Sequence, residues 1–280
     1  MEIYIEGNPA HSLVMRSKRL KFLASLVAIL VWPTIVGASA TRPGDAEQAP
    51  IIVFAAASLT DVLTAQASAW SQASGQPQPR LSFGPSATMA RQAAAGAPAD
   101  LVLSANRYWI DFLARKGLIQ KTPKDFAYNR LVLAVPVSHD VSKIETLDRT
   151  KILATLGDRR LAIADPALAP AGDYARRYLQ YIGLWGQLQN RLVIGTSARQ
   201  TLMLIERGGM AGFVYVSDAK ASDLVKEAGR VPFADLPKIT YMAGLMATAP
   251  EEAQAFLEHL RSHKATGVWQ QYGFEPLAHP

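Results

Sequence analysis

Short apolar runs that break into small or hydroxyl residues and then open a helix recur along this chain of 280 residues. They constrain the fold more than any other feature, because a regular alternation of strands and helices is typical of α/β proteins. In these proteins, helices cover both faces of a sheet that is mostly parallel. Four of the junctions are the most distinct, at residues 51–60, 81–88, 161–172 and 192–198.

Each junction brings hydrogen-bond donors to a helix N-terminus. The first N–H groups of a helix have no partner within it and carry a partial positive charge. Serine and threonine add hydroxyl donors there without adding a competing charge. Because α/β sheets bind ligands at the carboxyl ends of their strands, four such starts in one cleft predict a site for a small anion. The candidate binding residues are Ser58, Ser86, Ala171, Ala198 and, at the end of a strand, Tyr215.

Taken singly, these residues have ordinary structural interpretations. Ser58 and Ser86 each fit the N-cap position of the helix that comes next, and Tyr215 fits a core aromatic residue. Ala171 lies between Pro170 and Gly172, and small residues allow a backbone N–H to approach a ligand closely. The five residues together are therefore a more specific signal than any one of them.

The alternation falls into two sets of strands and helices. No sequence repeat, low-complexity tract or glycine-rich or proline-rich linker separates the two sets. Two lobes joined by long strands explain this continuity. We expect residues 48–130 together with 238–280 to form the first lobe, and residues 131–237 to form the second.

Residues 1–40 have the features of a cleavable signal peptide. A basic stretch precedes an apolar run over 22–31, and Ala38-Ser39-Ala40 is a cleavage motif. Met15 fits the true start, because residues 1–14 lie outside this pattern. An uncleaved membrane anchor is disfavoured, since the apolar run is short and Pro33 interrupts the chain soon after it.

The chain contains no cysteine, which excludes disulfides, thiolate metal sites and a lipid anchor at the cleavage site. An exported chain without cysteine indicates a free periplasmic protein of a bacterium. After the apolar run of the signal peptide, no stretch is long enough to span a bilayer, so we expect no membrane insertion of the mature chain.

The basic charge gives no indication of nucleic-acid binding. The net charge is +6, and residues 1–40 hold four Lys/Arg and two Glu, which leaves +4 on the mature chain. The basic residues of the mature chain are scattered, which favours a solvated surface.

Catalytic motifs are weak. The sequences around Ser86 and Ser197 lack the closing glycine of a nucleophile elbow, and no histidine stands in a recognised triad pattern. His259 and His263 have the four-residue spacing of zinc ligands, but Leu260 stands where the usual motif needs glutamate. No nucleotide-binding glycine motif is present, so we expect no enzyme activity and no cofactor.

Several motifs together resemble those of the periplasmic molybdate-binding proteins of ABC transporters. The resemblance extends over about residues 51–275, nearly the whole mature chain. The motifs are FAAASLT at 54–60, SATMARQ at 86–92, GAPADL at 96–101, DPALAPAGDYA at 165–175, VYVSDA at 214–219 and QYGF at 271–274.

The resemblance implies a two-lobed periplasmic solute-binding fold of type II, in which each lobe is a mostly parallel sheet flanked by helices and the ligand lies in the cleft. It implies that Ser58 and Ser86 bind the ion through hydroxyl and N–H groups. Ala171 and Ala198 are expected to bind it through N–H groups, and Tyr215 through its phenol. Molybdenum would be bound only as the oxyanion, through these same residues.

This chain departs from the family pattern at a few positions. Gly84, Pro85 and Ala87 stand where serines are frequent, Ala198 where valine is common and Ser217 where threonine is common. A backbone donor is little affected by its side chain, so these changes bear on selectivity more than on anion binding.

The expected function is binding of molybdate, and also tungstate, by a monomer that delivers the ion to an inner-membrane ABC permease. The alternatives are another tetrahedral oxyanion such as sulfate, an exported hydrolase that uses Ser58 or Ser86, and the effector lobe of a transcription regulator. The hydrolase lacks an evident histidine partner. The regulator conflicts with the export signal and with the absence of a helix-turn-helix segment.

Overall fold

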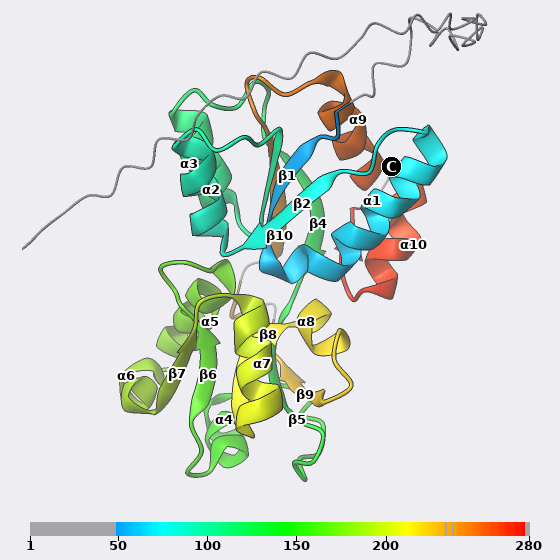
Figure 1. The fold of residues 1–280 in the computed structure, drawn as a ribbon. Helices are drawn as coiled ribbons and strands as arrows, with labels where there is room; N and C mark the ends of the chain where they lie inside the picture. Colours follow the sequence, from blue (N-terminus) through cyan, green and yellow to red (C-terminus); the bar gives the residue numbers. More distant parts are fainter. Residues whose placement is uncertain (1–48, 233, 237, 278–280) are drawn as a thin grey trace, which may run out of the picture. The chain divides into compact units, whose positions relative to one another are not determined.

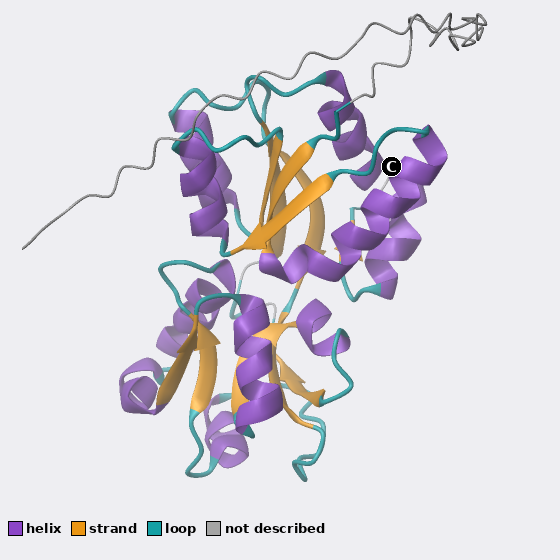
Figure 2. Cartoon of the chain, in the orientation of Figure 1, coloured by secondary structure: helices purple, strands orange, loops and turns teal. Residues whose placement is uncertain are grey.

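The computed structural model describes residues 49–232, 234–236 and 238–277. Two β-sheets, each flanked by helices, organise this part of the chain (Figures 1 and 2). The first sheet has the strand order β11-β4-β10-β3-β1-β2 and the second has the order β7-β6-β8-β5-β9. We call each sheet with its helices a lobe.

The first lobe takes strands from both ends of the described chain. Figure 1 shows α2 and α3 on one side of its sheet and α1, α9 and α10 on the other. Its strands are β1 (Ile52–Ala56), β2 (Arg80–Gly84), β3 (Leu101–Ser104), β4 (Lys124–Asn129), β10 (Ile239–Leu245) and β11 (Glu275–Pro276). Its helices are the 3-10 turn η1 (Ala57–Leu59), α1 (Thr60–Ser74), α2 (Ser86–Ala94), α3 (Arg107–Arg115), α9 (Glu251–Leu260) and α10 (His263–Gln271).

The second lobe uses the chain between β4 and β10. Its strands are β5 (Leu131–Pro136), β6 (Leu161–Ala164), β7 (Leu192–Gly195), β8 (Ala211–Tyr215) and β9 (Val225–Arg230). Its helices are α4 (Arg149–Leu156), α5 (Pro170–Tyr181), α6 (Trp185–Leu188), η2 (Gln189–Arg191), α7 (Ala198–Gly208) and α8 (Val216–Lys220). The expected residue boundaries of the two lobes stay a prediction.

The α/β class and the two sheets confirm the predicted fold, but both sheets are mixed rather than mostly parallel. In the first sheet β1 pairs with β2 and β3 in parallel, whereas β10 is antiparallel to β3 and β4. In the second sheet β6 is parallel to β7 and β8, whereas β5 is antiparallel to β8 and β9. The chain crosses into the second lobe just before β5 and returns just before β10. β5 and β10 each begin where the chain passes between the lobes, whereas their neighbours β8 and β3 end on that side of the sheet. β5 and β10 therefore run antiparallel to these neighbours, which makes both sheets mixed.

Buried strands account for the core of each lobe. All six residues of β5 are buried, as an apolar strand covered on both faces requires. In the first lobe the side chains of Trp269, Phe126 and Tyr241 are fully buried and pack edge-on or tilted against each other or Phe274.

Three strands, β4, β9 and the short β11, were not predicted from the sequence. β4 carries Lys124, Asp125 and Asn129 and lacks a long apolar run, and β9 is similarly polar. The predicted signal peptide, including Met15, lies outside the described residues. Among the helices that the structure describes, none combines the length and the apolarity that a membrane span requires.

Candidate functional site

All five predicted binding residues line one small cavity. Ser58 and Ser86 come from the first lobe, and Ala171, Ala198 and Tyr215 come from the second. The remaining lining residues are all alanine, glycine, proline or serine. The cavity volume is about 10 Å³, which is near the roughly 10–15 Å³ that one water molecule needs. The cavity is therefore small, and residues of both lobes line it.

Ser58 does not cap the helix that comes after it. It lies inside η1, whose N-cap is Ala56, and no side chain caps either η1 or α1. The Ser58 hydroxyl is instead 2.8 Å from the hydroxyl of Tyr241, which is on β10, and both residues are buried. The tyrosine therefore orients the serine hydroxyl at the edge of the cavity.

Ser86 is likewise no cap. It is the first residue of α2, where Pro85 holds the N-cap position without a side-chain hydrogen bond. Its hydroxyl oxygen accepts a hydrogen bond from the N–H of Ala105 at 3.3 Å. Because the oxygen accepts this bond, the hydroxyl proton remains free for a ligand. The simple N-cap interpretation is thus wrong for both serines.

Ala171 and Ala198 present backbone donors. Ala171 is the second residue of α5 and Ala198 the first of α7, positions whose N–H groups have no partner within their helix. No acceptor for either N–H occurs in the described part of the chain. Gly172 brings the first turn of α5 onto β6, because a Cβ there would lie 2.0 Å from the Ala164 carbonyl oxygen.

Tyr215 supplies a side-chain donor. Tyr215 is 1% exposed, and its hydroxyl is buried without a hydrogen-bond partner among the described residues. Burial raises the pKa of this phenol well above its usual value of 10.0. The group is therefore a neutral O–H donor at physiological pH. A buried donor without a partner destabilises a protein by about 1–3 kcal/mol, so a ligand that accepts this hydrogen bond would remove the penalty.

Among the described residues, no ionisable side chain other than Tyr215 lines the cavity, but an ion-pair chain lies directly beside it. Arg199, the residue after Ala198, pairs across the lobes with Asp61 of α1 at 2.6 Å. It also lies 3.2 Å from Asp218 of α8, within its own lobe. A backbone hydrogen bond joins the lobes as well, from the N–H of Ala87 to the carbonyl of Leu168 at 3.1 Å.

Asp218 is fully buried, and we expect its titration to be visible in the stability of the protein. Burial raises its pKa from 3.8 to about 6, although Arg199 and the Tyr215 N–H act in the opposite direction. The folded protein therefore binds more protons than the unfolded chain between about pH 4 and 6. The contribution of Asp218 to stability is fully present below pH 4 and is lost as the pH rises through 6.

Asp218→Asn removes this titration. The difference in unfolding free energy between the unaltered protein and the variant should fall by about 3 kcal/mol between pH 4 and pH 7. Urea unfolding of both proteins across this range measures the difference. A difference that is independent of pH would contradict the assignment.

Some site residues gave no sequence signal. Tyr241 lies on an apolar strand far along the chain, and Ala105 contributes only its N–H. The zinc interpretation of His259 and His263 gains no support, because His259 instead contacts the Gln66 side chain at 3.0 Å. In the described residues, no group of three or more possible ligands could hold a metal ion.

Residues 51–275 match the family model described as bacterial extracellular solute-binding protein. The chain belongs to this family. Members of this family bind solutes and are not enzymes, which agrees with the prediction that the chain is not an enzyme.

Similar proteins extend over most of this solute-binding protein. The molybdate-binding protein ModA of Haemophilus influenzae is 34% identical over 232 residues, which cover 82% of this chain and 91% of the relative. ModA of Escherichia coli is 36% identical over 233 residues, which cover 82% of this chain and 90% of the relative. The structure of the periplasmic molybdate-binding protein of Azotobacter vinelandii matches with a TM-score of 0.71 at 22% identity, over 81% of this chain and all of that one. That structural match shows a shared fold.

Proposed function

We propose that this solute-binding protein binds molybdate, and also tungstate, and delivers the ion to an ABC importer. The buried, unpartnered hydroxyl of Tyr215 carries the proposal. It lines the same cavity as two serine hydroxyls and the free N–H groups of Ala171 and Ala198. The relatives named as molybdate-binding proteins support this choice of ligand.

The chemistry of the donors favours an oxyanion without protons. Molybdate and tungstate are fully deprotonated dianions at neutral pH, so they accept hydrogen bonds at every oxygen. Hydrogenphosphate carries a proton that needs an acceptor, and no carboxylate of the described residues lines the cavity. Each hydrogen bond to a charged group contributes about 1.5–3 kcal/mol, and a helix N-terminus contributes about 0.3–1 kcal/mol. Several such donors can offset the dehydration of a dianion.

The proposal extends to the setting of the protein. It acts in the periplasm after removal of a signal peptide, as a monomer, and its partner is an inner-membrane ABC permease. It needs no separate cofactor, and it holds molybdenum only as the oxyanion. A relative in Bacillus subtilis, 28% identical over 90% of this chain, is named as a putative ABC transporter substrate-binding lipoprotein, which supports the transport role.

Calorimetric titration of the protein from residue 41 tests the ligand. We expect one molybdate or tungstate ion to bind per chain, and phosphate to bind far more weakly. Sulfate is also aprotic, so its rejection depends on the size of the cavity. At a hundredfold excess over Kd, binding to the folded state should raise the unfolding free energy by about 2.7 kcal/mol. Absence of heat and of any thermal shift with millimolar molybdate and tungstate would disprove the proposal.

Replacing Tyr215 by phenylalanine tests the hydroxyl that carries the proposal. The ring and its packing against Tyr241, with centroids 5.9 Å apart, are retained. We expect molybdate to bind about 1.5–3 kcal/mol more weakly, because one hydrogen bond to a charged ligand is lost. Stability without ligand should stay the same or increase, since an unpartnered buried hydroxyl is removed. Unchanged affinity would show that the phenol does not contact the ion.

A further inference from the structure

A second, larger cavity adjoins the candidate site and is rich in arginine. Its volume is about 370 Å³. Residues of both lobes line it, among them Arg91 of α2, Arg176 and Arg177 of α5, and Trp109 of α3. It shares Ala169 and Pro170 with the small cavity. Those two residues directly precede Ala171, so the arginine cavity lies at the start of the same helix.

The arginine cavity carries a net positive charge. Asp173 is its only carboxylate in the described residues, against three guanidinium groups, which leaves a charge of +2. Asp173 bonds Arg176 through one oxygen at 2.6 Å and Arg177 through the other at 2.9 Å. One carboxylate thus holds two arginines without neutralising both.

The guanidinium groups are also held in place by the fold. The Arg91 guanidinium carbon is 5.1 Å from the ring centroid of Trp109, at a distance typical of a cation–π contact. The Nε atom of Arg176 is buried without a hydrogen-bond partner in the described part of the chain. Arginines that are positioned in advance, with donor groups not fully used, suit the capture of an oxyanion.

The two cavities differ in a way that divides their roles. Within the part of the chain that the structure describes, neither lysine nor arginine lines the small cavity, so its N–H and O–H donors act only at short range. The arginines attract a dianion over a distance of about the Debye length, roughly 10 Å at 0.1 M salt. Clefts lined by charges of one sign raise association rates by about 10- to 1,000-fold, and salt suppresses this effect.

We propose that Arg91, Arg176 and Arg177 form an outer anion site that captures the tetrahedral dianion before it reaches the inner cavity. This inference rests on the proposed function. The outer site sets the rate of association, whereas the uncharged inner donors set the rate of release.

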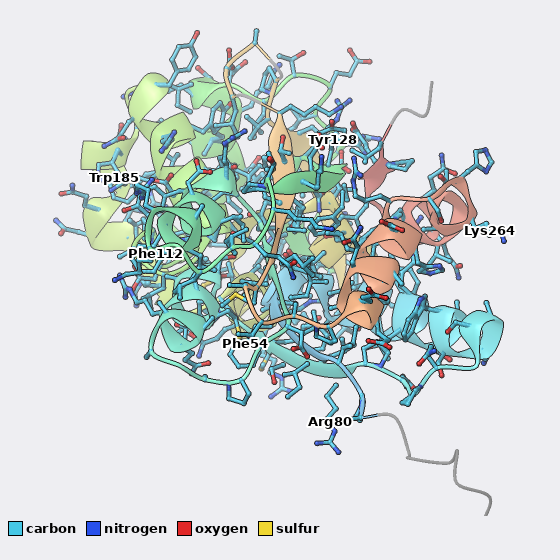
Figure 3. All side chains as sticks on the ribbon, turned by 90° about the horizontal axis from the view of Figure 1, so that it is seen from above. Phe54, Arg80, Phe112, Tyr128, Trp185 and Lys264 are labelled. Carbon is cyan, nitrogen blue, oxygen red and sulfur yellow. The ribbon has the colours of Figure 1, made fainter. Side chains whose placement is uncertain are left out.

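Stopped-flow tryptophan fluorescence with molybdate tests the outer site, at about 20 mM and about 300 mM ionic strength. The variants are Arg91→Gln, Arg177→Gln and the double variant. Arg80→Gln is the matched control, because Arg80 is an exposed arginine of β2 outside the arginine cavity, and Figure 3 shows it extending away from the ribbon. At low salt we expect the association rate constant to fall about threefold in each single variant and about tenfold in the double variant.

The pattern of rate constants decides the outcome. The differences should shrink at high salt, the dissociation rate constant should stay unchanged, and Kd should rise by the factor that association loses. An association rate in the double variant equal to that of the Arg80→Gln control would overturn the outer site. A loss that persists at high salt, or that appears in dissociation, would also overturn it. Failure of the unaltered protein to bind molybdate or tungstate in calorimetry would instead remove the proposed function, and the outer site with it.

Discussion

Replacing both Ser58 and Ser86 by alanine is expected to weaken molybdate binding by about 2–6 kcal/mol, which is roughly 30-fold or more. Under the proposed function each serine donates one hydroxyl hydrogen bond to the dianion, so each single variant should lose about 1–3 kcal/mol of binding free energy. The two serines sit on separate helix starts and have different partners, Tyr241 and the Ala105 N–H. Their losses should therefore be nearly additive. Calorimetric titration of the two single variants and the double variant measures them.

Ser68→Ala is the matched control for this series. Ser68 lies on α1 and does not line the cavity, so its loss should leave affinity unchanged. Neither Ser58 nor Ser86 caps its helix, and stability without ligand should change less than affinity. If the double variant bound molybdate as tightly as the control, the ion would have to be held elsewhere.

Gly172→Ala is expected to lower the unfolding free energy by about 3 kcal/mol and to weaken molybdate binding tenfold or more. The added Cβ would lie 2.0 Å from the carbonyl oxygen and 2.6 Å from the carbonyl carbon of Ala164. These are backbone atoms of β6, which cannot turn aside as a flexible side chain can. The first turn of α5 must therefore shift, and the N–H of Ala171 shifts with it. Urea unfolding and calorimetry measure the two effects.

The same substitution at Gly267 provides a contrast. Gly267 lies inside α10, and a Cβ there would meet no atom of the described residues within 4 Å apart from its chain neighbours and its own helix backbone. Alanine is a better helix former than glycine by about 1 kcal/mol, so Gly267→Ala should stabilise the protein and leave binding intact. Equal stability of the two variants would show that α5 has room to move away from β6.

The grouping of the five candidate residues around one cavity could be predicted because its signals are local. An apolar strand that ends in small residues and opens a helix can be recognised within about ten residues. Parallel strands bring their carboxyl ends to one edge of a sheet. Ser58 and Ser86 come after β1 and β2, and Ala171 and Ala198 come after β6 and β7, so the topology gathers them around one cavity. The antiparallel strands β5 and β10 do not disturb this, because they lead away from it.

The contacts that orient the donors could not be predicted. Tyr241 is 183 residues from Ser58 in the chain, and no local pattern links them. The same applies to Asp61 and Arg199, which are 138 residues apart, and to the arginine cavity assembled from α2, α3 and α5. These contacts between residues far apart in the sequence depend on the packing of whole elements in three dimensions. The periodicity of strands and helices along the chain does not predict that packing.

The Asp61–Arg199 ion pair and the Ala87–Leu168 hydrogen bond join the lobes through protein atoms alone. If ligand binding closes the lobes, as the proposed function implies, these contacts stabilise the closed form in the absence of ligand, and apparent affinity scales with the fraction of molecules in the competent state. A substitution at Asp61 can therefore change occupancy at low solute concentration while every donor to the ion is preserved. Under the proposed transport role, separation of the lobes to release the ion has to break these protein contacts as well. Under that role, capture at low solute concentration and release of the ion depend in opposite directions on residues that lie outside the lining of the small cavity in the described part of the chain.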